Sequence, residues 1–224
     1  MREALMPPIS GSTVESFREK SASMQPTPAG VAIAAVSASF ALGLLAKALA
    51  VSGRRSVHGA DTARLEPLTV AARAESSRML QIATDDAAAF ETYLASARLP
   101  RTTDRERLER RQALESAFRR TIDLPLSAAR SASAGLKLCV DGIPMTHVMV
   151  VADLAAAATL LAGALRAFLL CAESNVRLLA PESPAYRELI AHEASRHERA
   201  HHQAQEVLDR VAAALEAAEP GREP

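Results

Sequence analysis

Apolar residues recur every three to four positions along almost the whole chain, and no convincing segment alternates at every second position. The first spacing places side chains on one face of an α-helix, whereas the second is that of a β-strand. Proline and glycine fall mostly at the ends of the periodic segments, where they interrupt helices. We therefore predict an all-α protein, a single-domain antiparallel bundle of five or six helices.

The breaks in this pattern predict where the helices begin and end. The predicted helices cover residues 14–23, 30–52, 68–98, 103–122 with a continuation to 140, 148–179 and 184–217. Thr103 and Glu106 have capping-box spacing, and Pro125 is expected to kink or restart its helix. Residues 1–13 are expected to form a flexible tail, residues 14–217 the bundle, and residues 218–224 a disordered tail.

Composition excludes several classes of protein. The 224 residues are 49% hydrophobic, and 26 basic residues balance 26 acidic ones. A chain of zero net charge lacks the basic excess of a nucleic-acid binder. Aromatic residues make up 3% and tryptophan is absent, so there is little to stack on bases. We expect no nucleic-acid partner.

Two apolar runs, residues 29–46 and 148–171, are long enough to raise the question of a membrane span. The first consists mainly of small residues and ends at Lys47, and the second contains Asp153 and Arg166. Charges are costly in lipid, and small residues also suit close helix packing in a soluble bundle, so we expect no membrane span. Two cysteines are too few for a disulfide scaffold, which favours a cytoplasmic location.

Common catalytic signatures are absent, including a phosphate-binding glycine loop, HExxH and CxxC. Cys139 and Cys171 lie in apolar helical segments, where a buried structural thiol is expected. His197 and His201 are four residues apart and share a helix face, which a metal site requires. They also continue a seven-residue apolar pattern from Ile190 to Leu215, and a third ligand is not evident. We therefore expect no metal.

Two carboxylates are candidates for chemistry. Asp153 is isolated in an apolar run, so burial would require either a partner or a raised pKa. Asp86 lies next to Asp85 midway along a predicted helix, where aspartate is unfavourable. Such a pair is either solvated surface or part of a site.

Several segments, in order, resemble one family. They are Ser16-Phe17, the break Pro26-Thr27-Pro28, the alanine-rich helix after it, LQIATDDAAAFETYLASARLP at 80–100, Leu-Pro-Leu around Pro125, the helix headed by Asp153 with Ala164-Leu165-Arg166, and Asn175. From about Val14 to Leu179 the chain resembles the cyclodeaminase/cyclohydrolase family. This family includes the C-terminal domain of formiminotransferase-cyclodeaminase and bacterial methenyltetrahydrofolate cyclohydrolases.

The resemblance implies a one-carbon unit on tetrahydrofolate as substrate, with hydrolysis or ring closure and loss of ammonia as the reaction. It implies no cofactor, and a homodimer with sites near its interface. The catalytic candidates are Asp153 as the leading acid/base, Asp86 as a second carboxylate, and His147 as either a proton shuttle or a loop residue. The candidates for binding substrate are Pro28, Gly30, Arg166 and Asn175.

Departures from the family pattern lie at the same places. The family's Pro-Gly-Gly-Gly-Ser loop reads Pro28-Ala29-Gly30-Val31-Ala32 here. The side chains of Ala29 and Val31 are expected to crowd a ligand that approaches the helix N-terminus. Family asparagines are replaced at His147, Met149 and Cys171.

Three functions therefore stay open. The first is an enzyme of folate one-carbon chemistry. The second is an enzyme that carries out another C–N cyclisation or elimination on a non-folate molecule. The third is a non-catalytic helical dimer or ligand-binding subunit, which the pattern from Ile190 to Leu215 would support.

Overall fold

The computed structural model describes residues 9–179 and 184–217, and within these ranges it contains helices and no strand. The α-helices are α1 (Val14–Ser21), α2 (Gly30–Arg55), α3 (Gly59–Ala97), α4 (Asp104–Gly142), α5 (Val151–Leu179) and α6 (Pro184–Ala217). Short 3-10 helices are η1 (Ile9–Gly11), η2 (Ile143–Met145) and η3 (Val148–Val150). The all-α bundle predicted from periodicity is confirmed.

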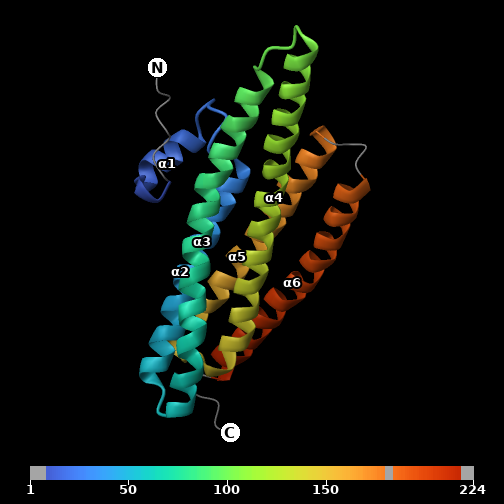
Figure 1. Ribbon diagram of the computed structural model, residues 1–224. Helices are drawn as coiled ribbons and strands as arrows, with labels where there is room; N and C mark the ends of the chain where they lie inside the picture. The colour runs from blue at the N-terminus through green and yellow to red at the C-terminus, as the bar shows by residue number, and fades with distance from the viewer. Residues whose placement is uncertain (1–8, 180–183, 218–224) are drawn as a thin grey trace.

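Helices α2 to α5 run up and down and form a closed four-helix bundle (Figure 1). α2 packs between α3 and α5, α4 closes the ring from the other side, and α6 lies along α4 and α5. Alanine fills many buried positions, and large apolar side chains are buried among the helices, including Leu42, Leu45, Leu49, Leu126, Leu136, Leu154, Leu161, Leu165 and Phe168. Small side chains let the helix axes approach closely, as the alanine-rich sequence predicts.

The N-terminal segment makes contacts earlier than the predicted boundary at residue 14. Ile9 packs against the core, and its backbone N–H donates to Thr84 Oγ1 on α3 at 3.3 Å. The rest of the predicted tails, residues 1–8 and 218–224, lies outside the described residues. Figure 1 shows α1 itself outside the bundle.

Two prolines lie inside helices that the sequence analysis shortened or divided. α3 begins at Gly59 rather than at residue 68 and contains Pro67. Pro67 cannot donate to the carbonyl of Ala63, but both residues are exposed, so water can satisfy that carbonyl. α4 runs through Pro125 without a break. The prediction that Pro67 would lie before the helix was therefore wrong.

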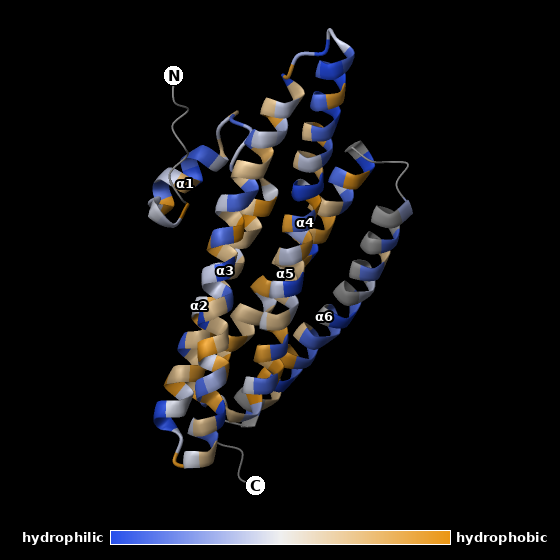
Figure 2. Ribbon diagram, viewed as in Figure 1, coloured by the Kyte–Doolittle hydropathy of each residue, from blue (hydrophilic) through white to orange (hydrophobic). Residues whose placement is uncertain are grey.

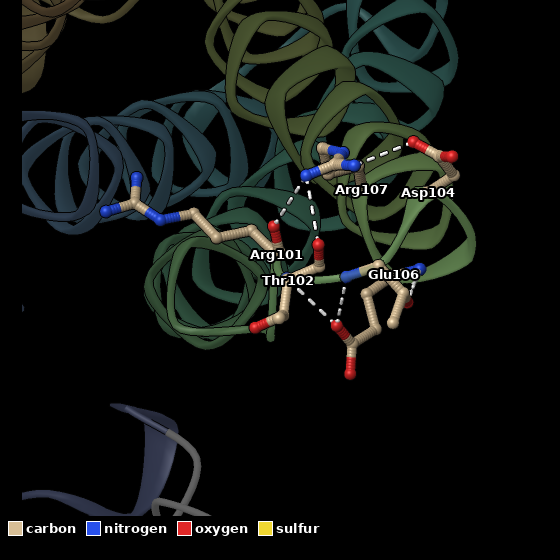
Figure 3. Close-up of polar contacts among 6 residues, drawn as sticks. Arg101, Thr102, Asp104, Glu106 and Arg107 are labelled. Atoms are coloured by element: carbon tan, nitrogen blue, oxygen red, sulfur yellow. Dashed lines mark hydrogen bonds and ion pairs between the residues drawn. The ribbon is translucent and has the colours of Figure 1, made fainter.

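The predicted capping box forms the turn between α3 and α4 (Figure 3). Thr103 Oγ1 accepts from Glu106 N at 3.2 Å, and Glu106 Oε2 accepts from the backbone N–H of Thr103 at 2.8 Å and of Thr102 at 2.9 Å. Arg107 donates to the carbonyl of Thr102 and pairs with Asp104 at 2.7 Å. These bonds pair the free backbone groups of a turn whose side chains are mainly hydrophilic (Figure 2).

Two helical segments, Gly30–Arg55 and Val148–Arg177, are long and apolar enough to cross a membrane by length and composition. Of their most apolar windows, 61% and 44% are buried within the protein. The first segment is α2, and the second is η3 together with α5. These two helices pack against each other in the bundle. Burial within the protein core accounts for the apolar character of α2 in particular.

Candidate functional site

The first turn of α2 is an open helix N-terminus. Its N-cap residue, Ala29, is extended and provides no side-chain hydrogen bond. Thr27 and Pro28 before it are buried, and Thr27 Oγ1 donates to Glu91 Oε1 on α3 at 3.4 Å. The first backbone N–H groups of the helix therefore lack a side-chain partner and carry the positive end of the helix dipole.

Gly30 at this N-terminus lies directly against α5. A Cβ atom built on Gly30 would be 3.1 Å from the Sγ atom of Cys171, which is closer than an ordinary contact. Glycine is therefore required for this approach unless the cysteine moves. The loop before α2 keeps one of the glycines of the family pattern, Gly30. This is the position where a side chain would press against Cys171 of α5.

Asp86 on α3 completes this group. Burial raises its pKa from 3.8 to about 6, and within the described chain it makes no hydrogen bond or ion pair. Burial and the charge of Asp86 together raise the pKa of the Cys171 thiol. Gly30, Asp86 and Cys171, from three helices, form what we call the Asp86 site.

The neighbouring Asp85 points elsewhere. Its carboxylate accepts from Gln81 Nε2 at 2.9 Å and lies 3.6 Å from Arg120 Nη2 on α4. Successive helix residues point about 100° apart, so one carboxylate joins α4 while the next is desolvated and unpaired. Of the two, Asp86 has the properties of a proton-transfer group.

Asn175, one turn beyond Cys171 on α5, has a structural hydrogen bond. Its Nδ2 donates to the backbone carbonyl of Thr121 at 2.8 Å. That carbonyl has no helical donor because the residue four positions later is Pro125, which lacks an N–H. The Asn175 amide thus replaces the missing helical bond, which leaves its Oδ1 and its second N–H for other partners.

Asp153 and His147 lie at the opposite end of α2 and α5. Asp153 Oδ2 is 3.3 Å from Lys47 Nζ, and its side chain is 36% exposed. Asp153 and Cys171 are eighteen residues apart on α5, which is about 27 Å at 1.5 Å per residue. The structure therefore does not bring Asp153 and Asp86 together within one chain.

His147 accepts from the backbone N–H of Met149 through Nδ1 at 3.2 Å and caps η3. The backbone N–H of His147 donates to Ser52 Oγ at 2.9 Å. These bonds are those of a loop residue, one of the two roles expected for it. Arg166 is exposed on α5, and the described residues offer it no hydrogen bond or ion pair.

Other candidates carry less chemistry. Cys139 is buried, which raises its pKa to about 12 and makes its thiol unreactive. The side chain of His197 lies outside the described residues. Among those described, no three His, Cys, Asp or Glu side chains form a group suited to a metal ion.

Comparison with known proteins identifies the family. A family model described as formiminotransferase-cyclodeaminase matches residues 13–196, most of the chain. The chain belongs to the formiminotransferase-cyclodeaminase family. The family expected from the sequence motifs is thus confirmed.

Two relatives give the degree of similarity. Methenyltetrahydrofolate cyclohydrolase from Methylorubrum extorquens is 25% identical over 118 residues, which span 53% of this chain and 57% of that protein. The crystal structure of formiminotetrahydrofolate cyclodeaminase from Thermotoga maritima superposes with a TM-score of 0.76 at 17% identity. That superposition covers 93% of this chain and 98% of that chain. The structural likeness shows a shared fold.

Within this family the chain's altered loop is less obstructed than expected. Val31 is buried among core residues, so its side chain turns away from the helix N-terminus. Ala29 and Gly30 are exposed there. Val31 lies in the core rather than on the exposed surface of the first turn of α2, so Ala29 is the residue that stands at the open N-terminus. Cys171, by contrast, lies close to Gly30 at the site, and the signal for it in the sequence was that it stands at the position of a family asparagine.

Proposed function

We propose that this protein is an enzyme of one-carbon folate chemistry that hydrolyses or closes a C–N bond, with the Asp86 site as its reacting centre. The observation that carries the proposal is the desolvated, unpaired carboxyl of Asp86 near Cys171, whose Sγ atom lies close to Gly30 at an open helix N-terminus. A carboxyl with a pKa of about 6 exists in both protonation states near neutral pH, as acid–base catalysis requires. Family membership supplies the substrate class.

The chemistry needs one proton carrier. In hydrolysis, Asp86 accepts a proton from the water that adds to the methenyl carbon. It then returns that proton to the ring nitrogen as the C–N bond breaks, and the remaining hydroxyl proton passes to solvent as the formyl group forms. The same carboxyl, when ionised, also stabilises the cationic methenyl group before attack. In cyclodeamination the second folate nitrogen attacks the formimino carbon and gives its proton to Asp86, which passes it to the formimino nitrogen as that nitrogen leaves as ammonia. The residues of the site supply this proton transfer without a metal.

The test is the decay of methenyltetrahydrofolate absorbance with purified protein, followed by a formimino-substrate assay. Asp86→Asn should lower kcat by at least about a hundredfold. Asp85→Asn is the matched control, since it removes an adjacent, paired carboxylate and should leave kcat within about twofold. Because hydrolysis requires ionised Asp86, the rate should rise through pH 6. Equal loss in both variants would contradict the assignment.

A non-folate substrate is the second candidate, and Cys171 favours it. A thiol occupies the position of a family asparagine and contacts Gly30 closely. An amide can both donate to and accept from a pteridine, whereas a thiol does so weakly. Activity of Cys171→Asn towards methenyltetrahydrofolate, where the natural protein has none, would favour this candidate.

The described part of α6 gives the non-catalytic reading less support. Ala204, Val207 and Val211 of α6 are buried in the chain's own core, where α6 contacts α4 and α5. This part of the apolar pattern between Ile190 and Leu215 therefore packs within the chain.

We also propose that the chain works as a two-fold symmetric dimer through α2 and α5. Phe40 and Leu160, which are 61% and 47% exposed, lie on a face with Ile33 and Leu170 that we call the α2–α5 face. The contacts Gly30–Cys171 and Lys47–Asp153 show that these two helices are antiparallel. A two-fold axis midway along this face would place Asp153 of one protomer near the Asp86 site of its partner.

Mixing two variants tests this arrangement. Asp86→Asn and Asp153→Asn are co-expressed, and activity is compared with each variant alone. If each site takes one carboxylate from each protomer, mixed dimers contain one intact site, and activity should recover to about a quarter of the wild-type value. No recovery would contradict a shared site. Full activity of Asp153→Asn alone would remove Asp153 from the reaction.

A further inference from the structure

Two hollows follow the seam between α2 and α3, away from the Asp86 site. One, of about 430 Å³, is lined by Gly43, Ala46, Lys47, Arg73, Ser76 and Ser77. The other, of about 390 Å³, includes Arg54, Glu66 and Arg73 in its lining. Arg73 lines both, so the two hollows are neighbours, and together we call them the basic groove.

Small residues leave the groove open. A Cβ atom on Gly43 would have no neighbour within 4 Å, and Ala46 adds only a methyl group. Ser76 turns its hydroxyl towards Ser39, donating to the Ser39 carbonyl at 2.9 Å, and Ser77 donates to the Arg73 carbonyl at 3.2 Å. These hydroxyl protons are therefore used within the protein, and recognition is left to the cations.

The charge of the groove is unbalanced. Lys47, Arg54 and Arg73 face one acidic lining residue, Glu66. Lys47 also pairs with Asp153 at 3.3 Å, on the α5 side. The described residues give the guanidinium groups of Arg54 and Arg73 no ion pair or hydrogen bond. Guanidinium binds carboxylate or phosphate through two parallel bonds, so these groups suit a ligand with several negative charges.

We infer that the basic groove binds a small multivalent anion, either a polycarboxylate or a phosphate compound, with Arg73 at the centre and Lys47 and Arg54 on either side. Arg73 is thirteen residues from Asp86 on α3, about 20 Å along the helix. Within one protomer Arg73 is thus distant from the Asp86 site, and anion binding can be measured whether or not the proposed reaction occurs.

Calorimetric titration of the full chain with citrate and with pyrophosphate tests the inference. At least one anion should bind, and Arg73→Gln should weaken it by about tenfold or more. Arg54→Gln and Lys47→Gln should each weaken it less, because each contacts one end of the ligand. Binding of citrate but not of pyrophosphate would identify a carboxylate ligand. Binding of pyrophosphate but not of citrate would identify a phosphate ligand.

Arg111→Gln is the matched control, because Arg111 is exposed on α4, and the structure shows no ion pair for it with described residues. The affinity of the Arg111→Gln variant for the anion should equal that of the wild type. Wild-type protein that binds neither anion, unchanged affinity in Arg73→Gln, or an equal loss in Arg111→Gln would each overturn the inference. Circular dichroism should show wild-type helicity for all variants, because every substituted side chain is exposed.

Discussion

At the scale of single residues, orientation on a helix separates two adjacent carboxylates. Asp85 is bound by Gln81 and Arg120, whereas Asp86 is desolvated. An ionised carboxylate without a partner destabilises the folded state, and such a cost is typical of functional sites. The same scale includes Asn175, whose amide compensates for a proline on another helix.

Removing the charge of Asp86 should stabilise the protein above pH 6. The folded pKa of about 6 exceeds the ordinary 3.8, so ionisation opposes folding progressively between these values and fully above them. Asp86→Asn should therefore raise the free energy of unfolding at pH 7.5 by up to roughly 3 kcal/mol, at 1.36 kcal/mol per pKa unit. Urea denaturation at pH 7.5 and pH 5 measures this. A gain that does not shrink at pH 5, or that Asp85→Asn reproduces, would contradict it.

Asn175→Ala should destabilise the fold by about 1–3 kcal/mol, since it leaves the Thr121 carbonyl without a donor. Pro125→Ala restores a backbone N–H four residues after Thr121. In that background the cost of Asn175→Ala should fall by at least about 1 kcal/mol. Denaturant unfolding of the four proteins in the cycle measures the coupling. Additive costs would show that Asn175 does not replace the helical bond.

At the scale of elements, the turn between α3 and α4 is specified by local sequence. Thr103 and Glu106 bond reciprocally within four residues, and this box was predicted from spacing alone. Hydrogen bonds from the backbone N–H of Thr103 and Thr102 lower the pKa of Glu106. Its contribution is therefore present above the ordinary pKa and is lost as the pH falls through the lowered value.

Thr103→Ala should lower the free energy of unfolding by about 1 kcal/mol at pH 7, because the N-cap oxygen is lost. Thr92→Ala, an exposed threonine inside α3, is the control and should be neutral or slightly stabilising. Thermal or urea unfolding distinguishes the two. Equal effects would mean that the capping box does not contribute to stability.

At the scale of the whole molecule, α2 and α5 have one face in the core and an apolar outer face. A monomer that exposes Phe40 on α2 and Leu160 on α5 has apolar surface suited to association. In the proposed dimer, the separation of Asp153 from Asp86 within one chain would be closed across the two-fold axis.

Phe40→Arg should convert a dimer of the wild-type protein into a monomer. A charge placed at the centre of an apolar two-fold interface meets its own copy and is repelled. Leu108→Arg, at an equally exposed leucine on α4, should leave the mass unchanged. Size exclusion with light scattering measures both. A monomeric wild type, or a dimeric Phe40→Arg variant, would contradict the interface.

The sequence by itself determined the all-α class, most of the helix ends, the capping box and the family, but not the start of α3 or the passage of α4 through Pro125. Their signals are local: a 3.6-residue period, a four-residue motif, and an order of short segments. It also indicated Asp86 and Gly30 through the family pattern. The tertiary structure alone decided that Gly30, Asp86 and Cys171 come together. Asp153, which lies about 27 Å from Cys171 along α5, pairs instead with Lys47. Antiparallel packing aligns residues far apart in sequence, and desolvation depends on every neighbour. Neither the pKa of Asp86 nor the bond from Asn175 across to α4 follows from local pattern.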